Sequence, residues 1–151
     1  MKALNNISEL QVSYTPVKDW HKQPRIGSSK EAYSIVKKYF PAETIHLQES
    51  FVILYLNQEN RIIAVYSISK GGITGTVADV RLILGTALKL VAVGLIIAHN
   101  HPSGNINPSN SDNELTQKIK EASKLMDIKL LDHFIITPIE GKYFSFADEG
   151  L

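Results

Sequence analysis

The sequence predicts an α+β protein, a mixed α/β fold in which a central, mostly antiparallel sheet is flanked by helices. Segments rich in β-branched and aromatic residues outnumber segments with helical periodicity, and several of them follow one another across short turns, as antiparallel neighbours do. The composition, 44% hydrophobic and 21% charged, is sufficient for a folded core. Since about 100–200 residues is usual for one domain, the 151 residues predict a single globular unit.

Residues 1–27 are expected to form a short strand, at residues 7–14, followed by a polar arm. The arm contains Pro16, Pro24 and Gly27 among charged side chains, which is typical of an irregular connection. Residues 28–151 are then expected to form the globular domain.

A helix and a β-hairpin are predicted next. Ser28 and Glu31 have the spacing of a capping box, and apolar residues recur at helical intervals until Pro41 ends the pattern. Residues 49–57 and 61–69 are β-branched and aromatic runs separated by three polar residues. This pattern predicts a hairpin with a three-residue loop.

The middle of the chain predicts a turn, a helix and a buried strand. Residues 71–76 are rich in glycine, which indicates a turn or bulge leading into a short strand. Asp79 is suited to cap a helix that runs through Leu90. Residues 95–98 form a short, uninterrupted apolar run, typical of a strand that is buried on both faces of a sheet.

The last third of the chain predicts one more helix and two strands. Ser111 and Glu114 offer a second capping box, which predicts a helix that ends at about Met126. One face of this helix would carry Leu115, Ile119, Ala122 and Met126. Two strands, at residues 128–137 and 143–146, are expected to close the chain around a turn.

Charge and cysteine content exclude several classes of function. Sixteen Lys and Arg residues against fifteen Asp and Glu residues give a net charge of +1, so no overall field attracts nucleic acid or a membrane surface. Without cysteine the chain has no disulfide, no thiolate nucleophile and no sulfur ligand for a metal. Any bound metal must therefore be held by His, Asp, Glu and water.

We expect a cytoplasmic protein with no membrane span. The first 11 residues lack the continuous apolar run of a signal peptide. Residues 80–98 are apolar over the length of a membrane span, but Arg81 and Lys89 would each be costly at the centre of a bilayer. This segment is expected to divide into a helix and a buried strand.

A candidate metal site follows the buried strand. Residues two apart in a strand point to the same side, so His99 and His101 can direct both imidazoles at one point. Asp112 lies where the next helix begins, and the positive end of a helix dipole favours the ionised carboxylate that a metal needs. Two nitrogens and one oxygen would leave a fourth position open, which is typical of catalytic zinc.

The sequence HNHPSG, residues 99–104, followed by PSNSD, residues 108–112, resembles the JAMM (MPN+) metalloprotease motif in its bacterial RadC-like JAB-domain branch. The similarity extends from about residue 49 to the C-terminus. The resemblance implies a JAB/MPN-like fold of cytidine deaminase-like architecture and a zinc ion held by His99, His101 and Asp112. It also implies that Ser109 lies beside the bound water and that Glu49 activates this water.

These implied roles agree with the chemistry of the side chains. Zinc acidifies its bound water and polarises a scissile carbonyl. Glu49 can take the water proton and return it to the leaving amine, and the Ser109 hydroxyl can donate to the developing oxyanion. Ser109 can instead cap the helix, or do both, and Glu43 and Glu59 are rivals of Glu49. His133, beside Asp132, is expected to be a hydrogen-bonded core residue or a support for a ligand.

The predicted function is a zinc-dependent metallohydrolase that cleaves a peptide or isopeptide amide bond in a protein or peptide substrate. One alternative is a non-catalytic MPN-type binding module. Another is a nucleic-acid-interacting protein, because the RadC-like branch has a historical DNA-repair label. The net charge does not support this alternative, although one local patch could form from Lys118, Lys120, Lys124 and Lys129. A third alternative keeps the ligands and replaces zinc with non-haem iron.

Overall fold

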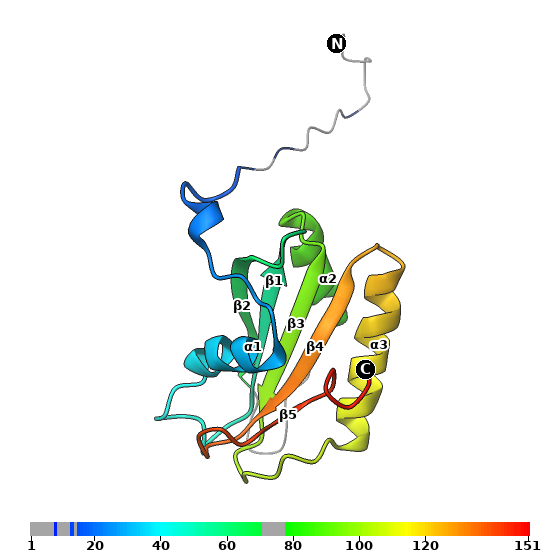
Figure 1. Ribbon diagram of the computed structural model, residues 1–151. Coiled ribbons are helices and arrows are strands. Elements are labelled where there is room, and N and C mark those ends of the chain that lie inside the picture. Colours follow the sequence, from blue (N-terminus) through cyan, green and yellow to red (C-terminus); the bar gives the residue numbers. More distant parts are fainter. Residues whose placement is uncertain (1–7, 9–12, 14, 71–77) are drawn as a thin grey trace.

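A five-stranded sheet, in the order β2-β1-β3-β4-β5, forms the centre of the computed structural model, which describes residues 8, 13, 15–70 and 78–151 (Figure 1). The strands are β1 (Ser50–Leu56), β2 (Ile62–Lys70), β3 (Gly94–Asn100), β4 (Lys129–Ile136) and β5 (Tyr143–Ser145). The β3–β4 pair is parallel, whereas the β1–β2, β1–β3 and β4–β5 pairs are antiparallel. The predicted α+β fold with a mostly antiparallel sheet is confirmed.

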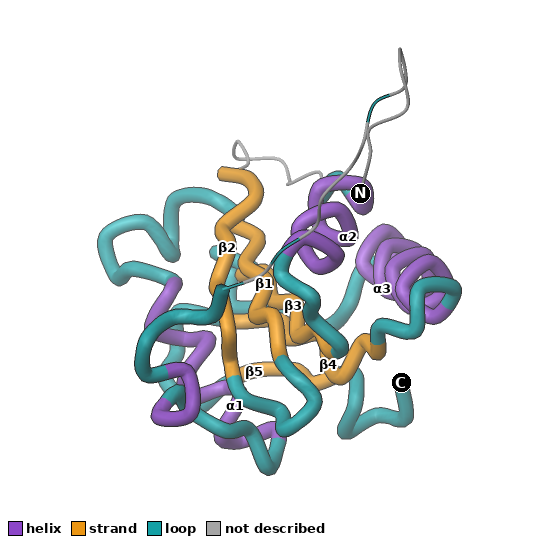
Figure 2. The backbone as a smooth tube through the Cα atoms, turned by 90° about the horizontal axis from the view of Figure 1, so that it is seen from above, coloured by secondary structure: helices purple, strands orange, loops and turns teal. Residues whose placement is uncertain are grey.

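Helices cover both faces of the sheet. They are α1 (Ser29–Val36), α2 (Val80–Lys89) and α3 (Asn110–Lys124), with short 3-10 turns at Trp20–Lys22 and Lys37–Tyr39. In the two views, α1 lies on one face, and α2 and α3 lie on the other (Figures 1 and 2). The helix α3 connects the parallel strands β3 and β4, because such strands need a crossover connection.

Two apolar cores result from the alternation of side chains along the strands. The core beneath α1 takes one set from β1, namely Val52, Leu54 and Leu56. The core beneath α2 and α3 takes the other set, namely Phe51, Ile53 and Tyr55. Every residue of β3 is buried, which confirms the prediction of a strand enclosed on both faces.

Of the two helix starts that the sequence allows, α3 adopts the earlier one. Ser109, not Ser111, is its N-cap, and Asp112, not Glu114, completes the capping box. Asp112 donates its N–H to Ser109 Oγ at 3.1 Å, and Ser109 donates its N–H to Asp112 Oδ2 at 2.8 Å. Ser109 with Asp112 and Ser111 with Glu114 both have the spacing of a capping box. The bonds between Ser109 and Asp112 already satisfy N–H donors of the first turn, so the helix starts there. Its end, Lys124, also precedes the predicted Met126.

Other predictions have mixed outcomes. The apolar segment 80–98 divides into α2 and β3 as expected, and no helix in the described part of the chain is both long and apolar enough to cross a membrane. The first helix is regular only to Val36, and Phe40 is already extended because it precedes Pro41. The turn at 71–76 and most of the strand at 7–14 lie outside the described residues. The domain division after residue 27 stays a prediction.

Ile97 of β3 tests the contribution of the core beneath α2 and α3. Its side chain is completely buried. The Ile97→Ala variant should therefore lower the free energy of unfolding by about 2–5 kcal/mol, because it removes apolar contacts and leaves a cavity. Chemical denaturation measures the change. The control variant Leu125→Ala, at a side chain that is 88% exposed, should change it by less than about 0.5 kcal/mol. Equal effects of the two variants would contradict this packing.

Candidate metal centre

The end of β3 places two histidines on the face of the sheet that α3 covers. Leu95 and Ile97 belong to the core on that face, and His99 follows them in the same alternation. His101 lies just beyond the strand, but its N–H donates to the carbonyl of Ile136 at 2.9 Å, which extends the ladder with β4 by one residue. Both imidazoles therefore point in the same direction, and their Nε2 atoms are 3.0 Å apart.

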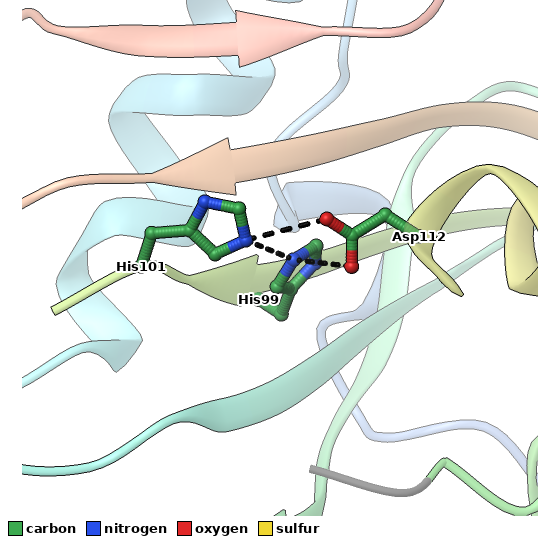
Figure 3. A group of neighbouring side chains, drawn as sticks. All are labelled: His99, His101 and Asp112. Carbon is green, nitrogen blue, oxygen red and sulfur yellow. Dashed lines mark hydrogen bonds and ion pairs between the residues drawn. The ribbon is translucent and has the colours of Figure 1, made fainter. Parts of the chain in front are cut away.

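The start of α3 provides the third side chain. The capping box holds the carboxylate of Asp112 through the N–H of Ser109. Asp112 Oδ1 lies 3.1 Å from His99 Nε2, and Asp112 Oδ2 lies 3.3 Å from His101 Nε2. Figure 3 shows the three side chains converging on one point, from the end of β3 and the first turn of α3. The structure thus brings His99, His101 and Asp112 together as a group that could hold a metal ion.

The protonation of His101 indicates that this group needs a cation. His101 Nδ1 lies 2.7 Å from the carbonyl oxygen of Asn105, which can only accept, so Nδ1 donates. In the neutral ring, Nε2 then carries a lone pair that faces the Asp112 carboxylate. Two acceptors at this distance repel each other unless a proton or a metal ion lies between them.

The dimensions of the group fit a tetrahedral metal. Zinc binds histidine nitrogens and carboxylate oxygens at about 2.0–2.2 Å, which separates neighbouring ligand atoms by about 3.3–3.6 Å in a tetrahedron. The two Nε2 atoms are 3.0 Å apart, His99 Nε2 lies 3.1 Å from Asp112 Oδ1, and His101 Nε2 lies 3.3 Å from the other oxygen, Oδ2. A small expansion of the group would therefore accommodate the ion.

The ionisation of the group suits a cation as well. The hydrogen bond to Asp112 raises the pKa of His101 against the effect of burial, and the charge of Glu49 adds to the increase. Burial alone would raise the pKa of Asp112, but the imidazoles of His101 and His99 beside it hold that pKa well below its usual range. Asp112 is therefore a carboxylate, and it stabilises positive charge at this point.

Asn100 fastens the segment that carries Glu49 to the end of β3. It is buried and lies on the face opposite the two histidines. Its amide donates to the carbonyls of Ile45 and Gln48, both at 2.9 Å, and its Oδ1 accepts the N–H of Ser50 at 2.7 Å. These bonds bracket Glu49, which is half-buried and close enough for its charge to act on His101.

The two rival glutamates have other environments. Glu59 lies in the turn between β1 and β2, where its carboxylate pairs with Arg61 at 3.0 Å. Glu43 is exposed on the turn that follows Pro41. Neither has a recorded interaction with His99, His101 or Asp112, whereas the charge of Glu49 acts on His101.

Ser109 is the N-cap of α3, and its hydroxyl can still donate a hydrogen bond. Its Oγ accepts the N–H of Asp112, so its hydroxyl hydrogen remains available, with no acceptor recorded among the described residues. Ser109 is exposed. The N-cap alternative from the sequence is thus correct, and it leaves the donor role open.

His133 contacts the ligand candidate His99 but is not itself one of the three converging side chains. Its Nε2 lies 2.8 Å from His99 Nδ1, the ring nitrogen of His99 that does not face Asp112. Its own Nδ1 lies 2.6 Å from Thr116 Oγ1. The ring stacks on Phe146 with a centroid separation of 4.8 Å. Burial lowers the pKa of His133 well below its usual value, so the ring is neutral.

The sequence analysis missed three residues that surround the group: Asn100, Asn105 and Thr116. Asn100 gave a signal, because an amide between two histidines at the end of an apolar run is rarely buried without partners. Thr116 follows Asp112 by one helical turn, a spacing that places both on one side of the helix. Asn105 contributes only its backbone carbonyl, so its residue type gave no indication of this contact.

These features define an α+β domain with a His-His-Asp group, which could hold a metal ion, at the end of its central strand. Comparison with known families gives the same result, since the RadC-like JAB domain model matches residues 26–151. The chain belongs to the RadC-like JAB domain family, and the resemblance seen in the HNHPSG motif is confirmed.

The relatives of this chain are UPF0758 proteins from diverse bacteria. One from Flavobacterium johnsoniae is 44% identical over 151 residues, which cover 99% of this chain and 64% of that protein. One from Porphyromonas gingivalis is 40% identical, with 99% and 65% covered. One from Aquifex aeolicus is 39% identical over 126 residues, with 83% and 52% covered. The chain thus spans at most about two thirds of these proteins.

Zinc affinity should fall as the pH is lowered through the raised pKa of His101. The proton on His101 stabilises the metal-free fold below the pKa of an unfolded histidine, and this stabilisation is lost as the pH rises through the folded pKa. Zinc must displace the same proton, so affinity should drop about tenfold for each pH unit below that pKa. Calorimetric titrations across a pH series measure this. A flat profile through that range would contradict the competition.

Proposed function

We propose that this chain is a zinc-dependent metallohydrolase that cleaves a peptide or isopeptide amide bond. The observation that carries the proposal is the convergence of His99 Nε2, His101 Nε2 and the Asp112 carboxylate within 3.3 Å. Three protein ligands of this kind leave one position open, as in catalytic rather than structural zinc sites. The likeness of the motif to that of JAMM metalloproteases supports the same reaction class.

Two physical properties of the chain support zinc as the ion. Two imidazoles and one carboxylate are ligands that zinc accepts, and the chain offers no sulfur ligand. The side chains of His99, His101 and Asp112 are 5%, 14% and 15% exposed, so the group is sheltered yet reachable by solvent. Bound there, zinc would acidify a water molecule and polarise the carbonyl of the scissile bond.

Glu49 acts as the general base in this proposal. Its carboxylate accepts a proton from the attacking water and later delivers it to the nitrogen of the leaving amine. The hydrogen bonds that Asn100 makes on either side of Glu49 hold this segment beside the histidines, so the position of the base does not depend on a free loop.

Ser109 acts as a donor to the oxyanion. Its backbone position is set by the capping box with Asp112, which also orients a ligand. In this proposal its hydroxyl, whose oxygen accepts the N–H of Asp112, donates its hydrogen to the negative charge that develops on the carbonyl oxygen.

Metal content tests the site. The purified protein should contain about one zinc per chain, as expected for a single site with three protein ligands, and elemental analysis measures it. The His99→Ala variant should lose this zinc, because it removes a ligand from the centre of the group. The control His21→Ala changes an exposed histidine and should keep it.

Three results would count against the proposal. Absence of bound metal in the wild-type protein would favour the non-catalytic binding module. Iron in octahedral coordination would favour the oxygenase type of site over a hydrolase. Equal zinc content in the His99→Ala variant would place the metal elsewhere.

Replacement of Glu49 tests the mechanism. The Glu49→Gln variant should retain zinc but lose hydrolysis by about 10²–10⁴-fold, because the amide has similar shape and cannot accept the proton. The assay follows new amine termini released from a library of linear and lysine-branched peptides. Glu59→Gln and Glu43→Gln are matched controls that should retain activity, because neither carboxylate contacts the metal group in the structure. Full activity of Glu49→Gln would refute this choice of base.

A further inference from the structure

A chain of buried hydrogen bonds leads from α3 through β4 to the candidate ligand His99. Thr116 Oγ1 lies 2.6 Å from the carbonyl oxygen of Asp112 and 2.6 Å from His133 Nδ1. His133 Nε2 lies 2.8 Å from His99 Nδ1. Thr116 and His133 are 3% and 0% exposed, so neither side chain has ready access to water as an alternative partner.

The direction of this chain follows from the number of hydrogens available. The Asp112 carbonyl can only accept, and two oxygens 2.6 Å apart repel unless a hydrogen lies between them, so the Thr116 hydroxyl donates to it. Thr116 has no second hydrogen, and its short contact with His133 therefore needs the hydrogen of His133 Nδ1. With its hydrogen on Nδ1, the fully buried His133 has a lone pair on Nε2, which accepts from His99 Nδ1.

The result is a fixed tautomer of His99. With its hydrogen on Nδ1, His99 presents a lone pair on Nε2 to Asp112 and His101, as a metal ligand must. The opposite tautomer would carry a hydrogen on Nε2 and point it at the Asp112 carboxylate, which would block the site. The ring of His133 cannot easily rotate out of this arrangement, because it stacks on Phe146 at an interplanar angle of 8°.

We propose that His133 and Thr116 are positioning residues that hold His99 in its metal-binding tautomer. The inference rests on the proposed metal site. In it, the buried hydroxyl of Thr116 sets the direction of every hydrogen bond in the series that ends at His99. His101 receives the same tautomer by a separate route, through the backbone carbonyl of Asn105. The two ligands from one strand are thus oriented by different parts of the fold.

Thr116→Val is the informative variant, because valine has nearly the same shape and no hydroxyl. Without that acceptor, the buried Nδ1–H of His133 loses its partner, and His133 is expected to move its hydrogen to Nε2. His133 then donates to His99, which leaves His99 with its hydrogen on Nε2. Zinc affinity should fall about 10–100-fold, the range seen when a partner of a ligand is removed.

Two further variants separate this effect from general destabilisation. Thr116→Ser keeps the hydroxyl and should bind zinc almost as the wild-type protein does. Thr137→Val removes another buried hydroxyl, which donates to the carbonyl of Lys142 at 2.7 Å. It should reduce thermal stability without a change in zinc affinity, because its hydrogen bonds do not reach the metal group.

The measurements are calorimetric zinc titration and nuclear magnetic resonance of the ring nitrogens in the metal-free protein, well above the usual pKa of histidine. We expect His99 to carry its hydrogen on Nδ1 in the wild-type and Thr116→Ser proteins and on Nε2 in Thr116→Val. The proposal is overturned if Thr116→Val keeps both the wild-type zinc affinity and the Nδ1–H form, or if wild-type His99 has its hydrogen on Nε2. If the wild-type protein binds no zinc, the proposed function is wrong, and the ring-nitrogen spectra still decide the tautomer question.

Discussion

The alternation of side chains along β3 is the constraint on which the site depends. Because this strand lies between β1 and β4 and is buried on both faces, its register cannot slip by one residue without turning its apolar side chains to the wrong core. That register directs His99 toward α3 and Asn100 toward the opposite face. The parallel ladder with β4 places His133 opposite Ile97 and continues to His101. The positions of the two histidines and of His133 are consequences of one strand pairing, whereas Asp112 and Thr116 come from α3.

The first turn of α3 serves the fold and the site with the same atoms. The capping box satisfies the N–H groups of Ser109 and Asp112, and in doing so it orients the carboxylate that completes the metal group. One turn further along, Thr116 meets His133 of β4. Substitutions at Ser109, Asp112 or Thr116 would therefore alter both the packing of this helix and the group at the end of β3.

The fold was largely predictable, because its signals are local. The apolar run at residues 95–98 and the hairpin at 49–69 have the periodicity and turns that strands require, and both are present. The sequence left two starts for α3 open, because the capping patterns at Ser109 and Ser111 overlap and only the actual bonds select the first. Helix boundaries are decided by such competition among nearby donors and acceptors, and pattern recognition does not resolve it.

For the candidate site, the sequence by itself determined the residues that are close in the chain: two histidines two positions apart, and a serine and an aspartate at a helix start. Their convergence follows from strand alternation and helix capping, which are local rules. Only the tertiary structure decided which partners complete them. Thr116 and His133 are 17 residues apart, and Asn100 and Ser50 are 50 residues apart. Their contacts exist because the sheet order brings β1, β3 and β4 together, and hydrogen-bond direction depends on atoms that only folding makes neighbours.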